Sequence, residues 1–292
     1  MITQYIQQRL ASVPLLPDFR AVLDEAVANS EHDPRVHPLH RLPLDIFHAL
    51  GGEDDRIIMP FVAAWSLLDY TVLRLDHLQD NDPEDIPLPT APNSDASYSL
   101  VLALYIAANA LLDDMDDQLV PDARWLRLRR LWNDCVLAGA SGQYRDLLSA
   151  NTSARGLDRL DEYQQLAHAK AGNLFALAFA APAILVTDDE SLITACRFAG
   201  EAFGALLQLG DDLRDQKDQL HHQGLTLPSA YAEAIQHLPQ PQGADATLLW
   251  AYWQHVRDVY RTQVDSALRQ AGSVRLESCV HQIFDTAFGS PQ

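Results

Sequence analysis

The sequence predicts an all-α fold, a single helical bundle, from the spacing of its apolar residues. These residues recur at three- and four-residue steps through most of the 292 positions, which is the period of an amphipathic helix. Alternating runs of Val, Ile and Thr bounded by turns, which indicate strands, are nearly absent. Hydrophobic residues make up 48% of the chain, enough for one large core. We therefore expect one domain over residues 1–292.

The periodicity predicts a series of helices along the chain, and prolines mark the breaks between some of them. Residues 81–93 contain four prolines, a density that ends the preceding helix and predicts a long loop. A second connection is expected over 238–245. The predicted helices cover 2–12, 17–30, 42–50, 57–80, 96–119, 122–150, 157–185, 189–219, 228–236, 244–271 and 275–287.

Composition argues against several classes of protein. The formal net charge is −19, and Lys170 and Lys217 are the only lysines, so nucleic acid and anionic membrane surfaces are disfavoured as partners. The longest apolar stretch, 174–186, is interrupted by Pro182 and is shorter than the roughly 20 residues of a membrane span. Residues 1–8 do not resemble a signal peptide. Three separated cysteines show no pairing or metal-type spacing, so a cytoplasmic protein with reduced thiols is expected.

The first of three acidic clusters ends a long apolar helix. Asp76 and Asp80 are four residues apart and share one helix face. Carboxylates at the C-terminal end of a helix oppose its dipole, but acidic helix ends are common in a protein this acidic. Taken alone, this cluster is therefore interpreted as an ordinary acidic helix end, with a functional role as the alternative.

The second cluster follows the apolar run 203–207 directly. Asp211 and Asp215 are four residues apart, Asp212 lies beside them and Gln208 comes one turn earlier. A solvated face usually mixes charges of both signs and does not begin abruptly inside an apolar run, so function is favoured here.

The third cluster, residues 113–117, contains four aspartates around Met115. It precedes a stretch rich in arginine, namely Arg124, Arg127, Arg129 and Arg130. We interpret this cluster as a solvated helix end paired with those arginines rather than as a metal site.

Considered together, these motifs resemble the trans-isoprenyl diphosphate synthase family, whose fold is an all-α bundle around a central cavity. Residues 76–80 resemble its first aspartate-rich motif and 208–215 its second, at a similar separation along the chain. Residues 142–147 resemble its Gly-Gln segment, 163–175 its Lys-Thr helix and 224–228 its Gly-Lys-x-Thr-x-Pro turn. The resemblance covers about residues 37–230, and the five landmarks are specific as an ordered set.

The resemblance implies a Mg²⁺-dependent enzyme that binds a prenyl diphosphate and forms a homodimer. Mg²⁺ prefers oxygen ligands and bridges carboxylates to phosphate oxygens, so an acidic pocket can bind an anion through it. Lys170 is expected to contact the diphosphate, because a buried lysine needs an anionic partner; an ordinary ion pair within the protein is the alternative. The implied metal ligands are Asp76, Asp80, Asp211, Asp212 and Asp215. The implied substrate-binding residues are Lys170, Gln208, Arg41, Phe175 and Gln143.

The sequence departs from the family where a second substrate, isopentenyl diphosphate, is bound. Residues 37–43 lack the lysine and paired glycines of the Gly-Gly-Lys-x-x-Arg motif, and 82–89 is acidic where the family has two arginines. Each lost charged contact costs about 1.5–3 kcal/mol. We therefore expect a terpene-synthase-like enzyme that ionises one allylic diphosphate.

Two alternatives stay open. The first is a true prenyltransferase that binds isopentenyl diphosphate through Arg41, His37 or His40. The second is a non-catalytic subunit of a synthase pair, although such a subunit has no physical need for acidic residues around a cavity. A role for His77 in metal binding also stays open.

Overall fold

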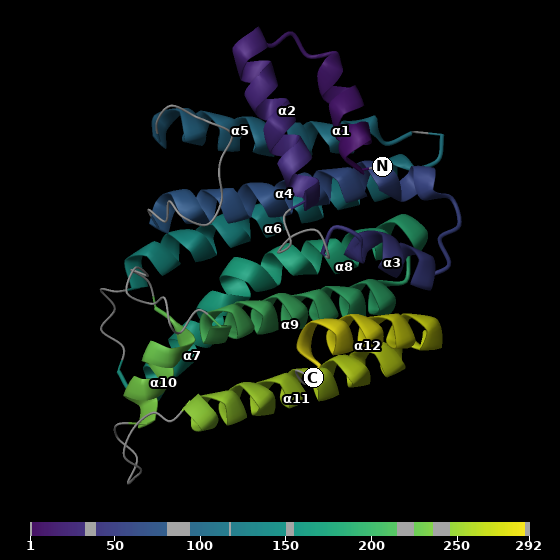
Figure 1. The fold of residues 1–292 in the computed structure, drawn as a ribbon. Coiled ribbons are helices and arrows are strands. Elements are labelled where there is room, and N and C mark those ends of the chain that lie inside the picture. The colour runs from purple at the N-terminus through teal and green to yellow at the C-terminus, as the bar shows by residue number, and fades with distance from the viewer. Residues whose placement is uncertain are drawn as a thin grey trace. The chain divides into compact units, whose positions relative to one another are not determined.

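The computed structural model describes residues 2–32, 39–80, 94–116, 118–149, 155–214, 225–235 and 246–289. For residues 31, 32, 80, 94, 95, 246 and 247, only the backbone is described. Within these ranges the regular secondary structure is helical and no strand occurs (Figure 1). The predicted all-α class is confirmed.

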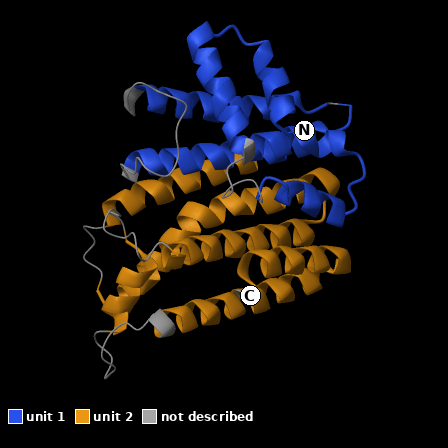
Figure 2. Cartoon of the chain, in the orientation of Figure 1, with its two compact units in different colours: residues 1–129 blue, residues 130–292 orange. Residues whose placement is uncertain are grey.

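The chain divides into two compact units, residues 1–129 and 130–292 (Figure 2). In the first unit α4 packs against α5, α3 packs on α4, and the pair α1 and α2 packs on both α4 and α5. The single domain expected from the sequence stays a prediction. The helices of the first unit are α1 (Ile2–Ala11), α2 (Pro17–His32), α3 (Leu42–Ala49), α4 (Asp55–Asp80) and α5 (Ser94–Leu111).

The second unit is built around α9, which lies between α8 and α11 (Figure 1). Every residue of α8 from Leu174 to Leu185 is buried, as expected for a helix that is apolar on all sides. Its helices are α6 (Asp122–Leu148, which begins in the first unit), α7 (Leu157–Ala167), α8 (Asn173–Val186), α9 (Glu190–Arg214), α10 (Leu227–Ile235), α11 (Ala246–Ala271) and α12 (Val274–Phe288).

The main departure from the predicted helices is a π-turn at His168–Gly172, between α7 and α8. The sequence predicts one continuous α-helix over 157–185, because hydrophobic periodicity does not register one extra residue in a turn. The helix expected over 96–119 also ends early, at Leu111, and continues as a 3₁₀ turn over Leu112–Asp114. The helix expected over 189–219 is described to Arg214.

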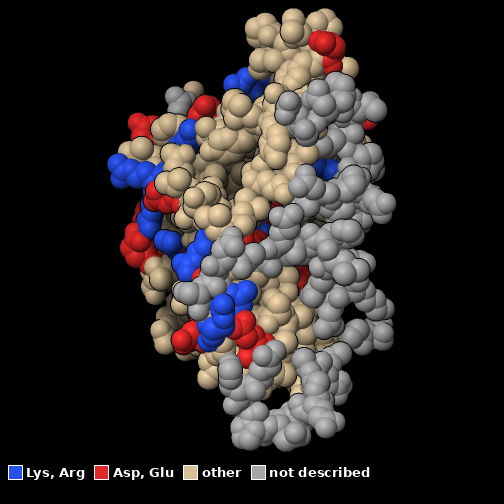
Figure 3. Space-filling model, turned by 90° about the vertical axis from the view of Figure 1, so that its left-hand side faces the viewer, with Lys and Arg blue, Asp and Glu red and all other residues tan. Residues whose placement is uncertain are grey.

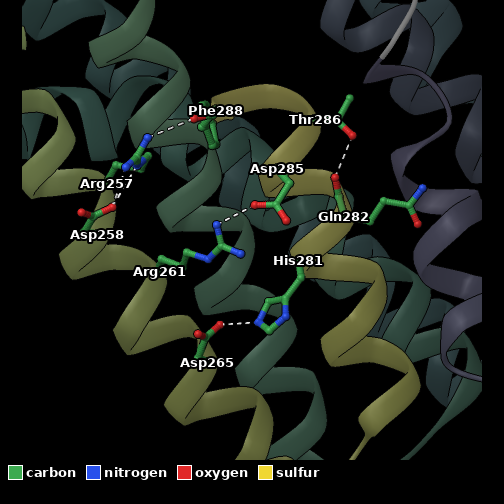
Figure 4. Close-up of polar contacts among 9 residues, drawn as sticks. All are labelled: Arg257, Asp258, Arg261, Asp265, His281, Gln282, Asp285, Thr286 and Phe288. Carbon is green, nitrogen blue, oxygen red and sulfur yellow. Dashed lines mark hydrogen bonds and ion pairs between the residues drawn. The ribbon is translucent and has the colours of Figure 1, made fainter. Parts of the chain in front are cut away.

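The C-terminal helices α11 and α12 form an antiparallel pair with polar contacts between them (Figure 4). Arg261 donates to Asp285 at 2.6 Å, and His281 lies 2.5 Å from Asp265. The exposed Arg261–Asp285 ion pair contributes about 0–1 kcal/mol. Burial of aromatic rings contributes more: Phe284 and Phe288 of α12 both contact Phe203 of α9, with centroids 5.5 and 5.1 Å away.

By length and mean hydropathy alone, four helical stretches in the described part of the chain are apolar enough to cross a membrane. The expectation that none would reach this threshold was wrong, because the threshold applies to the mean hydropathy of an 18-residue window, which can include a few polar residues or a proline. In that stretch, Leu157–Val186, 78% of the most apolar window is buried inside the protein. Absence of membrane insertion stays a prediction. The other stretches are Asp55–Gln79, Ala96–Asp114 and Glu190–Arg214.

The π-turn packs closely against α9 because α9 has a glycine at the contact. A Cβ atom on Gly204 would lie 2.4 Å from the carbonyl oxygen of Ala171. That distance is too short for any real contact, and the opposing atoms belong to backbone, which cannot move aside cheaply. Gly204 therefore sets how closely α9 and the π-turn approach.

We predict that Gly204→Ala lowers the free energy of unfolding by about 1–3 kcal/mol, the usual cost of overpacking. Gly210→Ala is the matched control on the same helix, because its Cβ would meet only Trp253 at an ordinary 3.7 Å. The control should be neutral or stabilising by up to about 1 kcal/mol, since alanine favours helix over glycine. Urea unfolding followed by circular dichroism measures both. Equal stability of the two variants would contradict the close contact.

Candidate functional site

Lys170 lies in the π-turn and is buried, with 9% of its surface exposed. Its ammonium donates to Oδ2 of Asp146 on α6 at 3.0 Å. Breaking such a pair by removing one partner costs about 3–5 kcal/mol, because the other charge is left buried. The expectation that Lys170 needs an anionic partner is met within the protein by Asp146.

Gly142 explains how α6 brings Asp146 to Lys170. A Cβ on Gly142 would lie 2.5 Å from the backbone nitrogen of Lys170, so only glycine allows this approach. Asp146 is one helical turn further along α6 and lies on the same face. The Gly-Gln segment identified in the sequence is thus the point where α6 meets the π-turn.

A small cavity adjoins the ion pair and is large enough for about one water molecule, with a volume of about 10 Å³. Oδ1 of Asp146 is buried and has no hydrogen-bond partner among the described residues. A buried acceptor without a partner is costly, so this oxygen is suited to a bound water or a ligand donor. The lining residues are Asp146, Tyr163, Leu166, Ala167, Lys170, Gln208 and Leu225.

Asp212 is a buried acceptor that holds several elements together. Its Oδ2 accepts from the Tyr163 hydroxyl at 2.6 Å and from the backbone N–H of Leu227 at 2.8 Å. Its Oδ1 accepts from the Gln208 side chain at 3.1 Å. Burial, together with the nearby Asp212 charge, raises the pKa of Tyr163 well above its ordinary value, so the phenol stays protonated and donates.

Hydrogen bonds hold the residues at the start of α10 in place. Leu225 donates its N–H to the Ser149 hydroxyl at 2.6 Å. Thr226 and Ser229 form a reciprocal cap, in which each backbone N–H donates to the other side chain, at 3.1 and 3.4 Å. The turn expected from the sequence at 224–228 is therefore tied to α6, and through Leu227 to Asp212.

The aspartates predicted as metal ligands occupy different environments. Asp211 is exposed on the last turn of α9 and pairs with Arg214, whereas Asp212 beside it is buried. Asp76 is partly buried near the end of α4, in the first unit. The side chain of Asp80 and the whole of Asp215 lie outside the described residues. That the two aspartate motifs face each other stays a prediction.

The predicted substrate-binding residues also differ in their surroundings. Gln208 lines the cavity beside Lys170. Gln143 is partly buried on α6, and Arg41 is exposed just before α3 in the first unit. Phe175 packs against Phe203, with centroids 5.2 Å apart. The structure thus brings Lys170 and Gln208 together around one cavity.

The aromatic residues of the second unit pack as a core. Phe203 is 1% exposed and also contacts Phe179 at 5.7 Å. These contacts are those of ordinary core packing.

The acidic cluster at 113–117 is an ion-paired helix end, as predicted. Asp113 lies 3.9 Å from Arg129, and Asp114 lies 2.8 Å from Arg9, a partner that the sequence did not indicate. Asp116 caps the following turn by accepting from the backbone N–H of Gln118. Asp117 lies outside the described residues.

The donor atoms of the site suit a hard cation only in part. No group of three or more His, Cys, Asp or Glu residues within the described ranges is placed to hold a metal. Mg²⁺ does not need such a group, because it is usually held by one or two carboxylates with waters and substrate phosphates. Asp211 fits that role, since its carboxylate is exposed. Asp212 already accepts three hydrogen bonds.

Asp146 and Ser149 are site residues that the sequence did not predict. Asp146 stood in a quoted motif, but nothing in its spacing linked it to Lys170, 24 residues away. The available signal was Gly142, which marks a close helix contact one turn earlier. Ser149 gave no signal, because its partner Leu225 is 76 residues away.

Comparison with known proteins supports the predicted family. The family model of polyprenyl synthetases matches residues 94–225, a range that includes Asp146, Lys170 and Asp212. No curated protein matches the whole sequence significantly.

Solved structures match over nearly the whole chain. A geranylgeranyl pyrophosphate synthetase from the archaeon Geoglobus acetivorans is similar with a TM-score of 0.73 and 18% identity, over 100% of this chain and 99% of that one. The enzyme of the same name from Pyrococcus horikoshii gives 0.75 and 18%, over 99% and 96%. A Helicobacter pylori geranyltransferase complexed with magnesium and isoprenyl diphosphate gives 0.72 and 18%, over 98% and 95%. These likenesses establish the fold.

We predict that Lys170→Met and Asp146→Leu each lower the free energy of unfolding by about 3 kcal/mol, because each leaves one charge buried. The double variant should be more stable than the sum of the two losses implies, since neither charge remains. Chemical denaturation of all four proteins gives the coupling free energy. Strictly additive losses would show that the 3.0 Å pair does not couple the two residues.

Proposed function

We propose that this chain ionises an allylic prenyl diphosphate whose diphosphate group is bound beside Lys170. The proposal starts from the match of residues 94–225 to the polyprenyl synthetase family model. The family match confirms the prediction of an isoprenoid synthase. The finer assignment is our proposal: the enzyme converts a single prenyl diphosphate, as a terpene synthase does, rather than joining two.

The observation that carries the proposal is the buried Lys170 with Asp146 beside it. Lys170 is one of two lysines in a chain of net charge −19, and the site holds it at low exposure on a π-turn. π-turns inside helices occur frequently at functional sites. A diphosphate oxygen that reaches Lys170 would accept from an ammonium whose position Asp146 already fixes, so little ordering is required when substrate binds.

The small cavity must widen for a diphosphate to reach Lys170, because its present volume admits only about one water. Tyr163 and Gln208 form part of its wall and are held by Asp212. Because Tyr163 and Gln208 are already hydrogen-bonded to Asp212, we expect them to keep their orientation while the rest of the cavity widens and the substrate displaces water. This chain's own residues therefore bind and orient the leaving group and keep water from it.

Magnesium, when bound, would supply a Lewis acid that stabilises the negative charge of the departing diphosphate. Asp211 would be one of its ligands, with Asp76 and Asp80 from the first motif. Arg214 pairs with Asp211, and this pair would have to open for Asp211 to bind the metal. Asp212 would act on the same helix as a positioning residue, through its contact with Leu227.

A reaction of one diphosphate is favoured over joining two by the shortage of positive charge. The cavity beside Lys170 has one cationic residue in its lining, Lys170 itself. Arg41, the cation expected to bind a second diphosphate, is exposed near α3. Each missing charged contact would weaken binding by about 1.5–3 kcal/mol.

Prenyl transfer is the second candidate, and the solved relatives favour it. Two of them are named geranylgeranyl pyrophosphate synthetases, and another is a geranyltransferase. In that reaction the same ionised intermediate would be captured by isopentenyl diphosphate instead of reacting with itself.

The exposed apolar residues support a homodimer. On α6, Leu137, Tyr144 and Leu148 follow helical spacing and are 73%, 68% and 50% exposed. On α5 of the first unit, Leu102 and Ile106 are 59% and 56% exposed one turn apart. Apolar stripes of this kind commonly mark interfaces between proteins, so we propose that the stripe on α6 packs against a second copy.

The surface charges agree with a small anionic substrate bound through metal rather than with nucleic acid. On the face in Figure 3, basic side chains are mixed with acidic ones and form no continuous basic stripe, which nucleic-acid binding would require. Cys135, Cys196 and Cys279 are free thiols, which agrees with the proposed cytoplasmic location.

We predict Mg²⁺-dependent release of pyrophosphate from a prenyl diphosphate without isopentenyl diphosphate. The purified full chain is incubated with C10, C15 and C20 allylic diphosphates, with and without Mg²⁺ and isopentenyl diphosphate, and extracts are analysed by mass spectrometry. Hydrocarbons or alcohols from one substrate support the proposal. Longer diphosphates formed only with isopentenyl diphosphate establish the second candidate, and no release in any arm indicates a non-catalytic subunit.

In that assay, Asp211→Asn should lower the rate of pyrophosphate release by about a hundredfold or more, as expected when a group that stabilises developing charge is lost. Its exposed position means that folding should be unaffected. Asp158→Asn, an exposed acid of α7 outside the cavity, is the control with the same charge change. Equal rates for both variants would remove Asp211 from the mechanism.

For the dimer, we predict that Leu137→Glu converts a particle of twice the 32.5 kDa chain mass into a monomer, because a buried charge at the interface is costly. Leu157→Glu on α7, where the leucine is 62% exposed, should leave the mass unchanged. Size-exclusion chromatography with light scattering measures both. A monomeric wild-type protein would refute the dimer.

A further inference from the structure

A second pocket lies in the second unit and is separate from the cavity beside Lys170. Its volume is about 620 Å³, within the roughly 300–1,000 Å³ of small-molecule sites. Residues of α7, the π-turn, α8, α9 and α11 form its walls. They are Asp161, Gln164, Gln165, His168, Ala169, Asn173, Glu201 and Tyr260.

The walls of this pocket are polar and carry negative charge. Asp161 and Glu201 are its two carboxylates, and no lysine or arginine is among its lining residues. Burial lowers the pKa of His168 and raises that of Tyr260 to about 12, so both are neutral at pH 7. The pocket therefore favours a cation, and its side-chain oxygens are acceptors for N–H donors.

A metal ion is the less suitable cation. His168 and the two carboxylates do not form a group placed to hold a metal, as holds throughout the described residues. The pocket is also much larger than a bare ion requires. An organic cation fills such a volume, and the Tyr260 ring, which meets His168 edge-on at 5.4 Å, offers an aromatic surface for it.

The two carboxylates lie at different levels of the pocket. Asp161 precedes His168 by seven residues, which corresponds to roughly 10 Å along a helix axis. The backbone of Glu201 lies beside Gly172, one turn beyond His168, because a Cβ on Gly172 would meet the Glu201 carbonyl oxygen at 3.1 Å and Nδ1 of His168 at 3.4 Å. A ligand that satisfies both carboxylates must therefore be extended, with a positive charge at each end.

We propose that this pocket binds an elongated aliphatic di- or polyamine, one ammonium at Asp161 and another at Glu201. Gln164 and Gln165 follow Asp161 in the pocket lining and supply amide oxygens that can accept from inner amines. Arg197 pairs with Glu201 at 3.0 Å from outside the pocket lining, so the amine competes with it for that carboxylate. The proposal is independent of the reaction at Lys170.

Calorimetric titration of the full chain with two diamines of equal charge tests the proposal. 1,8-Diaminooctane spans both carboxylates, and 1,4-diaminobutane is too short to do so. We expect saturable 1:1 binding of the longer diamine, tighter than that of the shorter one. Asp161→Asn and Glu201→Gln should each weaken it about tenfold, the effect of losing one charged hydrogen bond. Arg197→Ala should strengthen it, because the competing cation is removed.

Asp158→Asn is the control that distinguishes binding in this pocket from nonspecific attraction of amines to an acidic protein. It removes the same charge from the same helix, but Asp158 is not among the lining residues. Binding should be unchanged in this variant. Equal weakening by Asp158→Asn and Asp161→Asn, a failure of Arg197→Ala to strengthen binding, or no saturable binding at all would overturn the proposal.

Discussion

The arrangement of the second unit depends on burying one ammonium group. Lys170 is taken out of water by the helices around it, so a counter-charge must be supplied at hydrogen-bond distance. Asp146 provides it at 3.0 Å, and it can do so only because Gly142 lets α6 approach the backbone of Lys170. Gly204 permits the same approach from α9. Two glycines and one ion pair thus define where three helices meet.

Two neighbouring aspartates on α9 illustrate how one motif can serve two purposes. Asp212 is buried and accepts from Tyr163, Gln208 and Leu227, so it joins α7 and the start of α10 to α9. Asp211 is exposed at the surface and pairs with Arg214. The carboxylate of Asp212 is therefore held rigidly. The exposed carboxylate of Asp211 is carried on the same helix, whose position Asp212 helps to fix.

Much of the fold was predictable, because helical periodicity is a local property. The predicted helices 42–50 and 122–150 closely match α3 and α6. The π-turn was not predictable, since it results from tertiary contacts at Gly142 and Gly204 rather than from local propensity. In the site, Lys170 and Gln208 were identified by type and context. Asp146 and Ser149 were missed because their partners are remote in sequence and no local pattern marks them.

The π-turn also changes the helical phase of everything that follows it. One additional residue in a turn rotates the next helix face by about 100° relative to an uninterrupted α-helix. The mixed surface of α7, with Tyr163 inward and Asp161 outward, is thereby followed by α8, which is enclosed on all sides. The helical segment that is continuous in sequence therefore has two parts whose faces are oriented differently. Deleting one residue from 168–172 would rotate α8 relative to the helices that it packs against.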